Sequence, residues 1–426
     1  MRWPRSAGAL ALSSALVAVF VTGAEAPSDP PGPEVPATGK ADPCFAGFDA
    51  VMVSFLRKSD APGAALAVGR DGRVVYARGF GYADKENEEP VQPAALFRIA
   101  SISKPLTAVA VLQLVERDRL GLDDRVFDVL RLKAPDDPEE TFDARWKRVT
   151  ILHLLQHTGG WDRGKSFDPM FRSPEIVKEL DVAPPAGPDA VIRYMLRRPL
   201  DFDPGEEYAY SNFGYCLLGR VVEKVSGQDY ETYVRKEVLA PLGIASMKLG
   251  KTLPPGRAEG EVKYYASGTQ PAVLGPDLGK PVPPPYGAWS LEAMDSHGGW
   301  LAPADDLVRF AAAFARPAAC KILKEKSVRT LFGRPVGAPG QTPDGKPKPV
   351  YYGCGWLVRP VGDGSSLTTW HTGSLAGTST LLVRRADGLT LAALFNSREG
   401  AGKVVPSRAI EPLLHEAADA YVKAAK

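Results

Sequence analysis

The chain has 426 residues, of which 44% are hydrophobic and 24% are charged. This composition is ordinary for a globular protein, and the length is sufficient for one large core or for two lobes. The formal net charge of +2 gives no electrostatic reason to expect binding to nucleic acid or to a membrane surface.

The first 26 residues predict a secretory signal. Two arginines precede an apolar run over residues 7–21 and small residues follow it, so we expect cleavage after Ala24 or Ala26. The run is too short for a comfortable transmembrane helix. We therefore expect an exported protein, periplasmic or extracellular, with no membrane span after cleavage. Residues 27–43 are rich in Pro, Gly and Ala and have no apolar period, which predicts a linker.

The hydrophobic pattern after this linker predicts a helix followed by a pair of strands. Apolar residues recur at helical spacing over residues 44–57. Residues 64–68 and 74–77 predict two strands, and Asp71-Gly72 between them predicts a hairpin turn. A charged loop then leads to an apolar, helix-like segment over residues 97–116.

Helix patterns dominate from about residue 120 to about residue 289, and strand patterns return after that. In the middle region Thr150 is expected to cap a short helix, and two further helices end at Gly227 and Pro241. The later part predicts a helix over 303–314, a long loop over 334–350, strands over 351–358, 367–371, 379–384 and 389–395, and a last helix over 410–421.

Strands at both ends of the chain and helices in the middle predict an α+β fold. We expect one antiparallel sheet that is built from N- and C-terminal segments and flanked by helices, with an all-helical lobe inserted at about residues 120–289. The domain then extends over residues 44–426, and a substrate cleft is expected where the lobes meet.

Four cysteines are present, at scattered spacings that do not suggest a metal site. Export permits disulfides, and four thiols allow three complete pairings. Cys216 and Cys354 lie within apolar patterns, which favours buried thiols. A bridge between Cys44 and Cys320 is therefore expected. No cofactor and no metal are called for by the sequence.

Ser101 and Lys104 form a Ser-x-x-Lys motif near the start of the segment over residues 97–116. If Ser101 opens a helix, Lys104 lies one turn further along the same face, and its amine can reach the serine hydroxyl. Burial lowers the pKa of a lysine, so a neutral amine can accept the serine proton. A helix start with a solvated lysine is the ordinary alternative for so common a spacing, and the further motifs decide between the two.

Tyr210-Ser211-Asn212 precedes a predicted helix of the middle region. A phenol that faces Ser101 can relay a proton to a leaving group, and Asn212 can hydrogen-bond both the substrate and Lys104. A helix cap followed by core packing is the structural alternative for this tripeptide.

The sequence His371-Thr372-Gly373-Ser374 ends a predicted strand. A strand edge beside the nucleophile can orient a substrate, and the Ser374 N–H can pair with the Ser101 N–H to form an oxyanion hole. A second His-Thr-Gly, at residues 157–159, closes a predicted helix, and we interpret it as structural.

Ser-x-x-Lys, Tyr-x-Asn and His-Thr-Gly, in this order, resemble the motifs of the class C β-lactamase-related serine hydrolases, a group that includes penicillin-binding DD-peptidases, D-aminopeptidases and esterases. The similarity covers roughly residues 45–420. Further segments that carry it are Phe97–Ser101, Leu154–Gly160, Pro204-Gly205, Tyr208–Asn212, Pro241–Ile244, Gly298–Leu301 and Asp306-Leu307.

The resemblance implies a β-lactamase/transpeptidase-like fold and an acyl-enzyme mechanism. It implies that Ser101 attacks a carbonyl of a small molecule or short peptide, while Lys104 and Tyr210 share the roles of general base and acid. Asn212 is implied to position the substrate, and the backbone amides of Ser101 and Ser374 to bind the oxyanion. Asn396, which ends a strand in the manner of the family, is expected to touch the substrate.

His371 departs from the family pattern, because penicillin-recognising members usually carry a lysine at this position. A lysine is a permanent cation that can face a substrate carboxylate, whereas a histidine with an ordinary pKa is mostly neutral at pH 7. We therefore expect an esterase or a peptidase-like enzyme with poor β-lactamase activity.

Other function classes find less support in the sequence. The five histidines form no His-x-His or His-Glu-x-x-His pattern, and no Gly-x-Ser-x-Gly nucleophile elbow occurs. The remaining alternative is a non-catalytic protein of the same fold that binds a peptide or a cell-wall fragment. The joint presence of Ser101, Lys104 and Tyr210 argues against it, since together these groups suit acyl transfer.

Overall fold

The computed structural model describes residues 34–135 and 141–424. The predicted secretory signal and the first part of the predicted linker, residues 27–33, lie outside the described residues.

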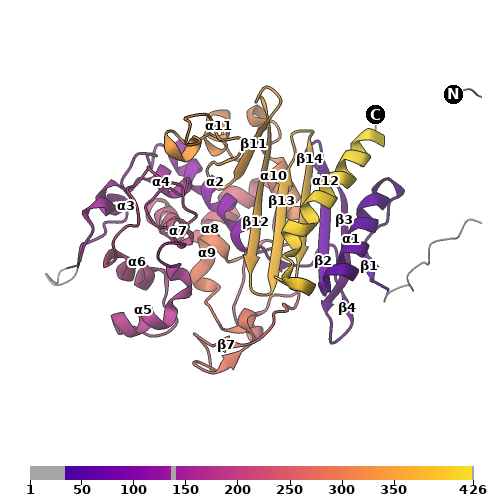
Figure 1. The fold of residues 1–426 in the computed structure, drawn as a ribbon, viewed down its shortest axis with the longest axis horizontal. Helices are drawn as coiled ribbons and strands as arrows, with labels where there is room; N and C mark the ends of the chain where they lie inside the picture. Colours follow the sequence, from indigo (N-terminus) through magenta and orange to yellow (C-terminus); the bar gives the residue numbers. More distant parts are fainter. Residues whose placement is uncertain (1–33, 136–140, 425–426) are drawn as a thin grey trace, which may run out of the picture. The chain divides into compact units, whose positions relative to one another are not determined.

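A single antiparallel sheet combines segments from both ends of the chain, as the sequence predicts (Figure 1). Its strand order is β1-β3-β2-β14-β13-β12-β11-β10, and β4 pairs with β3 outside this path. At the junction β2 pairs with β14, with Ala67 opposite Ala392. The strands are β1 (Ala37–Thr38), β2 (Gly63–Arg70), β3 (Arg73–Asp84), β4 (Glu89–Pro90), β10 (Tyr351–Tyr352), β11 (Leu357–Val361), β12 (Ser366–Leu375), β13 (Thr378–Arg384) and β14 (Leu389–Phe395).

Helices cover both faces of this sheet. On the outer face lie α1 (Ala46–Ser59) and α12 (Pro406–Ala424), whose apolar stripes share one hydrophobic cluster with the strands. On the inner face lie α2 (Ser103–Glu116) and α10 (Ala304–Ala312). The side chains of α2 are buried from Ser103 to Leu114, so this helix forms the centre of the molecule's larger core.

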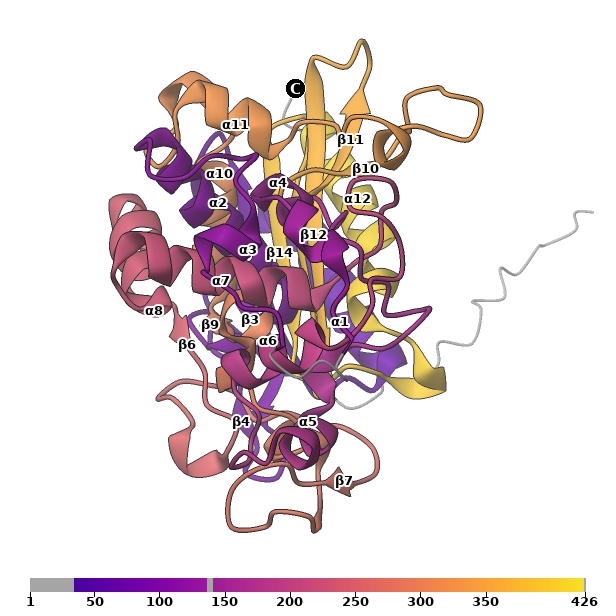
Figure 2. The same cartoon turned by 90° about the vertical axis from the view of Figure 1, so that its left-hand side faces the viewer.

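A mostly helical region packs against the far side of α2 (Figure 2). Its longest helix, α7 (Asn212–Ser226), begins at the Ser211 cap and ends at Gly227, whose positive φ suits the left-handed C-cap that glycine tolerates. The Thr150 cap is present as predicted, and its side chain accepts the His153 N–H. The other helices of this region are α3 (Val126–Val129), α4 (Ile151–Leu155), α5 (Ser173–Leu180), α6 (Pro188–Leu196) and α8 (Tyr230–Tyr233).

The end of the inserted region is not all-helical as predicted, because it also contains short strands. A three-stranded sheet joins β6 (Lys248–Leu249) to β9 (Trp300–Ala302) and β5 (Phe97–Arg98), and a ribbon pairs β7 (Gln270–Pro271) with β8 (Pro281–Val282). The many Pro and Gly residues of this stretch prevent long helices. The two α-helices not yet described are short: α9 (Asp295–Gly298) and α11 (Glu325–Leu331).

The predicted linker over residues 27–43 is wrong in its last part. Ala37 and Thr38 pair with Phe80 and Gly79 and so extend the sheet by one short edge strand. The Thr38 carbonyl also accepts a hydrogen bond from Arg78 Nε at 3.1 Å. The folded domain therefore begins before residue 44.

The expected bridge between Cys44 and Cys320 is also wrong, since all four cysteines are free thiols. Cys44 precedes α1 on the outer face of the sheet, whereas Cys320 packs against the core of the inner face. The sheet therefore separates the two thiols. Cys216 and Cys354 are buried, as expected.

No helix within residues 34–135 and 141–424 is both long and apolar enough to cross a membrane. The same residues hold no group of three or more His, Cys, Asp or Glu side chains arranged to bind a metal ion.

Candidate active site

Ser101 lies in a single 3-10 turn, Ala100–Ile102, between the short strand β5 and helix α2. Ala100 has a φ of +47°, which is unusual for a residue with a side chain and marks local backbone strain. The surroundings hold this conformation, because Ile99 donates its N–H to Trp300 O at 2.9 Å and accepts a bond from Thr380 Oγ1 at 3.0 Å. The turn that carries Ser101 is thus fixed by β9 on one side and β13 on the other.

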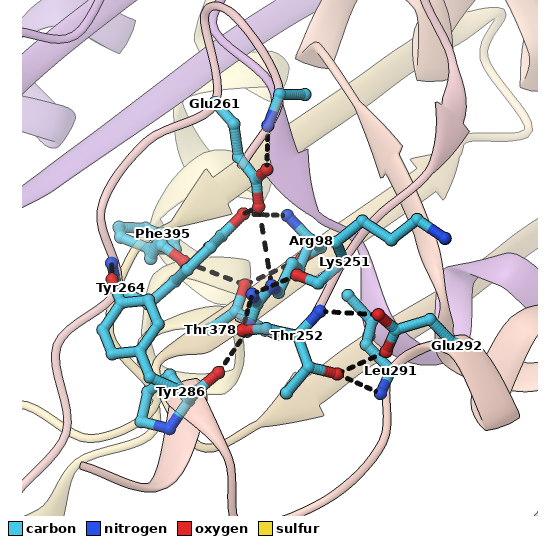
Figure 3. Close-up of polar contacts among 12 residues, drawn as sticks. Arg98, Lys251, Thr252, Glu261, Tyr264, Tyr286, Leu291, Glu292, Thr378 and Phe395 are labelled. Atoms are coloured by element: carbon cyan, nitrogen blue, oxygen red, sulfur yellow. Dashed lines mark hydrogen bonds and ion pairs between the residues drawn. The ribbon is translucent and has the colours of Figure 1, made fainter. Parts of the chain in front are cut away.

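The segment before Ser101 is anchored by a buried arginine (Figure 3). Arg98 Nε lies 3.5 Å from Glu261 Oε1, and both side chains are almost fully buried. Its terminal nitrogens donate to Pro285 O at 2.7 Å and Lys251 O at 2.8 Å. The Tyr264 hydroxyl accepts the Arg98 N–H and donates to the same carboxylate. One ion pair therefore ties the nucleophile segment to the 250–290 region.

Lys104 is completely buried, one turn after Ser101. Its Nζ lies 3.3 Å from Ser101 Oγ, 2.8 Å from Asn212 Oδ1 and 3.0 Å from the His297 carbonyl oxygen. Burial holds the pKa of Lys104 well below its usual value; the charge of Asp168 opposes this shift, and that of Arg163 adds to it. The neutral amine is thereby favoured.

The orientation of Asn212 follows from its other partner. Asn212 Nδ2 lies 2.7 Å from Asp168 Oδ2, and a carboxylate can only accept, so the amide oxygen must face Lys104. A neutral lysine amine has two N–H groups and one lone pair. The Asn212 oxygen and the His297 carbonyl can only accept, so they take both N–H groups, and the lone pair is left for the Ser101 hydroxyl proton.

Tyr210 lies against this amine, with its ring centroid 4.7 Å from Lys104 Nζ. The Tyr210 hydroxyl is buried and makes no hydrogen bond of standard geometry, although Ser101 is close enough to affect its pKa. Burial raises that pKa above the ordinary value for tyrosine, and the neighbouring Ser101 lowers it only in part. Tyr210 is therefore a protonated phenol at neutral pH, which suits a proton donor.

His371 is kept neutral by burial, and its hydrogen bonds fix the tautomer. Nδ1 lies 2.7 Å from the Thr372 carbonyl oxygen, so Nδ1 carries the proton, and Nε2 must accept from the Tyr352 hydroxyl at 3.0 Å. Burial lowers the pKa of His371 to about 3, and Lys104 contributes to this shift. The imidazole thus offers neither a positive charge nor a free N–H to a substrate carboxylate.

A cavity of about 320 Å³ opens beside the nucleophile. Ser101, Asn212 and Ser374 line it together with His297. Among the described lining residues, Arg163 and Arg398 are the charged ones, and the side chain of each is 51% exposed. Positive charge therefore lies at the rim of the cavity rather than at position 371.

Two predicted site residues make contacts within the fold. Asn396 is fully buried, accepts the Gly63 N–H at 2.8 Å and donates to Tyr82 O at 3.0 Å, so its amide connects β2 with β3, and the substrate contact stays a prediction. Gly373 is required by packing, because a Cβ at this position would lie 2.2 Å from Ile99 O. It allows β12 to approach the nucleophile segment and does not line the cavity.

The second His-Thr-Gly lies behind Tyr210 rather than in the cavity. His157 is buried, its ring centroid is 4.4 Å from that of Tyr210, and its Nδ1 accepts the Ser211 N–H at 3.2 Å. Burial holds the pKa of His157 well below its usual value, so it packs as a neutral ring. This contact supports the Tyr210–Asn212 segment.

Sequence reasoning missed Arg163, Asp168, Tyr352 and Arg398. Asp168 follows Phe167 in a loop between α4 and α5, and Tyr352 lies in a two-residue strand. Neither belongs to a motif with a fixed spacing to Ser101, and both reach the site only through the tertiary fold. The cap chemistry of Asp168, which accepts the Met170 N–H, was the local signal for a turn at this point.

The comparisons with known proteins agree with this arrangement. Residues 48–412 match the family model described as Beta-lactamase. Esterase EstB of Burkholderia gladioli is 34% identical over 250 residues, which cover 57% of this chain and 60% of that protein. Penicillin-binding protein 4* of Bacillus subtilis (strain 168) is 28% identical over 337 residues, which cover 77% of this chain and 66% of that protein. The chain therefore spans less than two thirds of the length of these two relatives.

A solved structure extends the likeness to the fold. The octameric penicillin-binding protein homologue of Pyrococcus abyssi superposes with a TM-score of 0.65 and 26% sequence identity, over 87% of this chain and 77% of that chain. The predicted fold class is confirmed by this likeness. Since the family model covers most of the sequence, the chain belongs to the β-lactamase family.

Proposed function

We propose that this protein is an exported serine hydrolase that cleaves an ester or an amide through an acyl-enzyme on Ser101. The observation that carries the proposal is the neutral, fully buried Lys104, whose lone pair is directed to the Ser101 hydroxyl. A named esterase and a named penicillin-binding protein among the relatives support hydrolysis of this kind. Export rests on the character of the first 26 residues.

In this mechanism Ser101 Oγ forms a bond to the substrate carbonyl carbon while its proton passes to Lys104 Nζ. The negative charge on the carbonyl oxygen is stabilised by the N–H groups of Ser101 and Ser374. Tyr210, whose pKa is raised by burial, donates the proton that the leaving group needs and is reprotonated from Lys104. Water then attacks the acyl-enzyme, with Lys104 as the base, and releases the acid.

The neutral state of His371 supports a preference for substrates without a carboxylate at that end of the cavity. A β-lactam carries its carboxylate close to the scissile bond and would lack the cation that lysine supplies in other family members. Esters and amides that carry no charged group next to the scissile bond do not need this cation.

The test is a rate panel on the mature protein with a p-nitrophenyl ester, nitrocefin and a D-alanyl p-nitroanilide, with Ser101→Ala as the blank. We expect ester or anilide turnover that Ser101→Ala abolishes, and nitrocefin turnover at least about a hundredfold slower, because a lost charge-assisted contact costs that order. Nitrocefin turnover equal to that of the best substrate would overturn the assignment to esters and amides. No turnover together with no labelling of Ser101 by an acyl probe would favour the non-catalytic alternative.

A further inference from the structure

A second cavity, of about 560 Å³, lies near the opposite end of the strands that form the catalytic site. It shares no lining residue with the catalytic cavity. Strand β12 connects the two, since Leu367 lines the second cavity and Ser374, further along the same strand, lines the catalytic one. The walls combine the rings of Phe314, Phe332 and Tyr351 with the polar turn at residues 364–366.

Arg384 reaches into this cavity without a counter-ion. Within the described residues no carboxylate lies at ion-pair distance from its guanidinium, and burial is the one influence on its pKa. The guanidinium lies over the Phe332 ring, with Cζ 5.2 Å from the ring centroid. Its Nε is buried without a hydrogen-bond partner, and the residue as a whole is partly exposed. Burial alone lowers the pKa of Arg384 to about 10. A cation in such a place is costly unless something pairs with it.

Thr369, the cross-strand neighbour of Arg384, also has a polar atom without a hydrogen-bond partner. Thr369 lies directly opposite Arg384 on β12, so both side chains lie on the same face of the sheet. Thr369 is fully buried, and its hydroxyl has no hydrogen-bond partner among the described residues. Two residues with unpartnered polar atoms are therefore cross-strand neighbours, and one of them, Arg384, lines the cavity.

The remaining lining residues indicate which kind of ligand could pair with Arg384. Arg329 lines the mouth, but it already pairs with Glu325 at 2.5 Å and is 75% exposed. Among the described lining residues there is no Asp or Glu. A guanidinium favours the planar, bidentate geometry of a carboxylate, and the three aromatic rings favour an apolar body attached to it.

We propose that this cavity is a binding site, separate from the catalytic cavity, for a small carboxylic acid with an apolar or aromatic body, whose carboxylate pairs with Arg384. The apolar body packs between Phe314, Phe332 and Tyr351. The inference does not depend on the proposed hydrolase activity, because it concerns equilibrium binding only.

The experiment measures binding of phenylacetate to the full chain by calorimetry, with phenylacetamide and inorganic phosphate as comparison ligands. Ser101→Ala serves as the host protein, so that the amide is not consumed. We expect saturable binding of phenylacetate, and at least about tenfold weaker binding of phenylacetamide and of phosphate, since each lacks one of the two recognised features. Equal affinity for the amide, or for phosphate, would overturn the proposal.

Arg384→Met keeps the apolar part of the side chain and removes the charge. We expect its affinity for phenylacetate to fall at least about tenfold. The ligand-free variant should melt at the same temperature as the parent or higher, because a buried N–H group without a hydrogen-bond partner is removed. A clearly lower melting temperature would mean that Arg384 already has a structural partner, and this too would overturn the proposal.

The control variant is Arg398→Gln, which removes a guanidinium from the rim of the catalytic cavity instead. It should bind phenylacetate as tightly as the parent. If Arg398→Gln loses the affinity and Arg384→Met keeps it, the acid occupies the catalytic cavity, and the second site is excluded.

Discussion

The pKa of Lys104 depends on two neighbouring charges of opposite sign. Asp168 raises this pKa and Arg163 lowers it, against a much larger lowering by burial. Ester hydrolysis requires the neutral amine, so kcat/KM should fall on the acid side as Lys104 becomes protonated. The two single substitutions, Asp168→Asn and Arg163→Gln, should therefore move the acid limb in opposite directions.

Asp168→Asn removes the charge that raises the pKa of Lys104, so the acid limb should shift to lower pH. It should also reduce kcat about tenfold or more, because Asn212 loses the charged, acceptor-only partner that fixes the orientation of its amide. Arg163→Gln should shift the limb to higher pH. The pH profile of kcat/KM with a neutral p-nitrophenyl ester checks both, and shifts in the same direction would contradict the assignment of Lys104 as the base.

Single residues also differ in how far their roles could be predicted. Ser101, Lys104 and Asn212 lie in short motifs whose spacing already implies contact, and the structure brings these residues together. Asn396 occupies a strand end, and nothing in its neighbours distinguishes a substrate contact from the buried amide bridge that it forms. The neutral state of His371 could be expected at pH 7, but the Tyr352 bond that fixes its tautomer depends on a distant strand.

Among the elements, β5 depends most on a single interaction. Replacing Arg98 by Met would leave the Glu261 carboxylate buried without its partner, and breaking such a pair costs about 3–5 kcal/mol. The urea midpoint and kcat should both fall, since β5 leads directly into the turn that carries Ser101.

The matched control is the double variant Arg98→Met with Glu261→Gln, which removes the stranded charge. It should recover a substantial part of the stability that the single variant loses. Equal stability of the single and double variants would show that the ion pair is not what anchors β5.

The predicted strand bounds were wrong where strand pairing or tertiary packing overrides the local sequence pattern. Residues 351–358 predict one strand, but the structure divides it into β10 and β11. Gly355 between them has a φ of +80° and approaches the Ala108 Cβ, so the chain turns to pack against α2. The edge strand β1 could not be predicted from the sequence either. Two residues are too few to show an alternating hydrophobic pattern, and their extended conformation depends on pairing with β3.

For the molecule as a whole, three buried histidines predict a loss of stability in acid. Burial lowers the pKa of His157, His297 and His371 below the ordinary value, so the folded state keeps each ring neutral. Their contribution is fully present above about pH 6.5 and is lost below it, by about 1.4 kcal/mol per pH unit for each ring. Urea midpoints at about pH 7.5 and pH 5.5 measure this loss.

His371→Gln removes one of these titrations and should reduce the difference between the two urea midpoints, while the other two histidines still contribute. A difference that is unchanged in His371→Gln would mean that this ring is not kept neutral by the fold.

The pairing of β2 with β14 also determines when the protein can first act during synthesis. The nucleophile segment leaves the ribosome early, directly after β3, but β2 lacks its second neighbour until almost the whole chain has been translated. Contacts of such long sequence separation form late and slowly. Under the proposed function, the nascent chain carries an unassembled site, and we expect hydrolytic activity only after the last strands have been released.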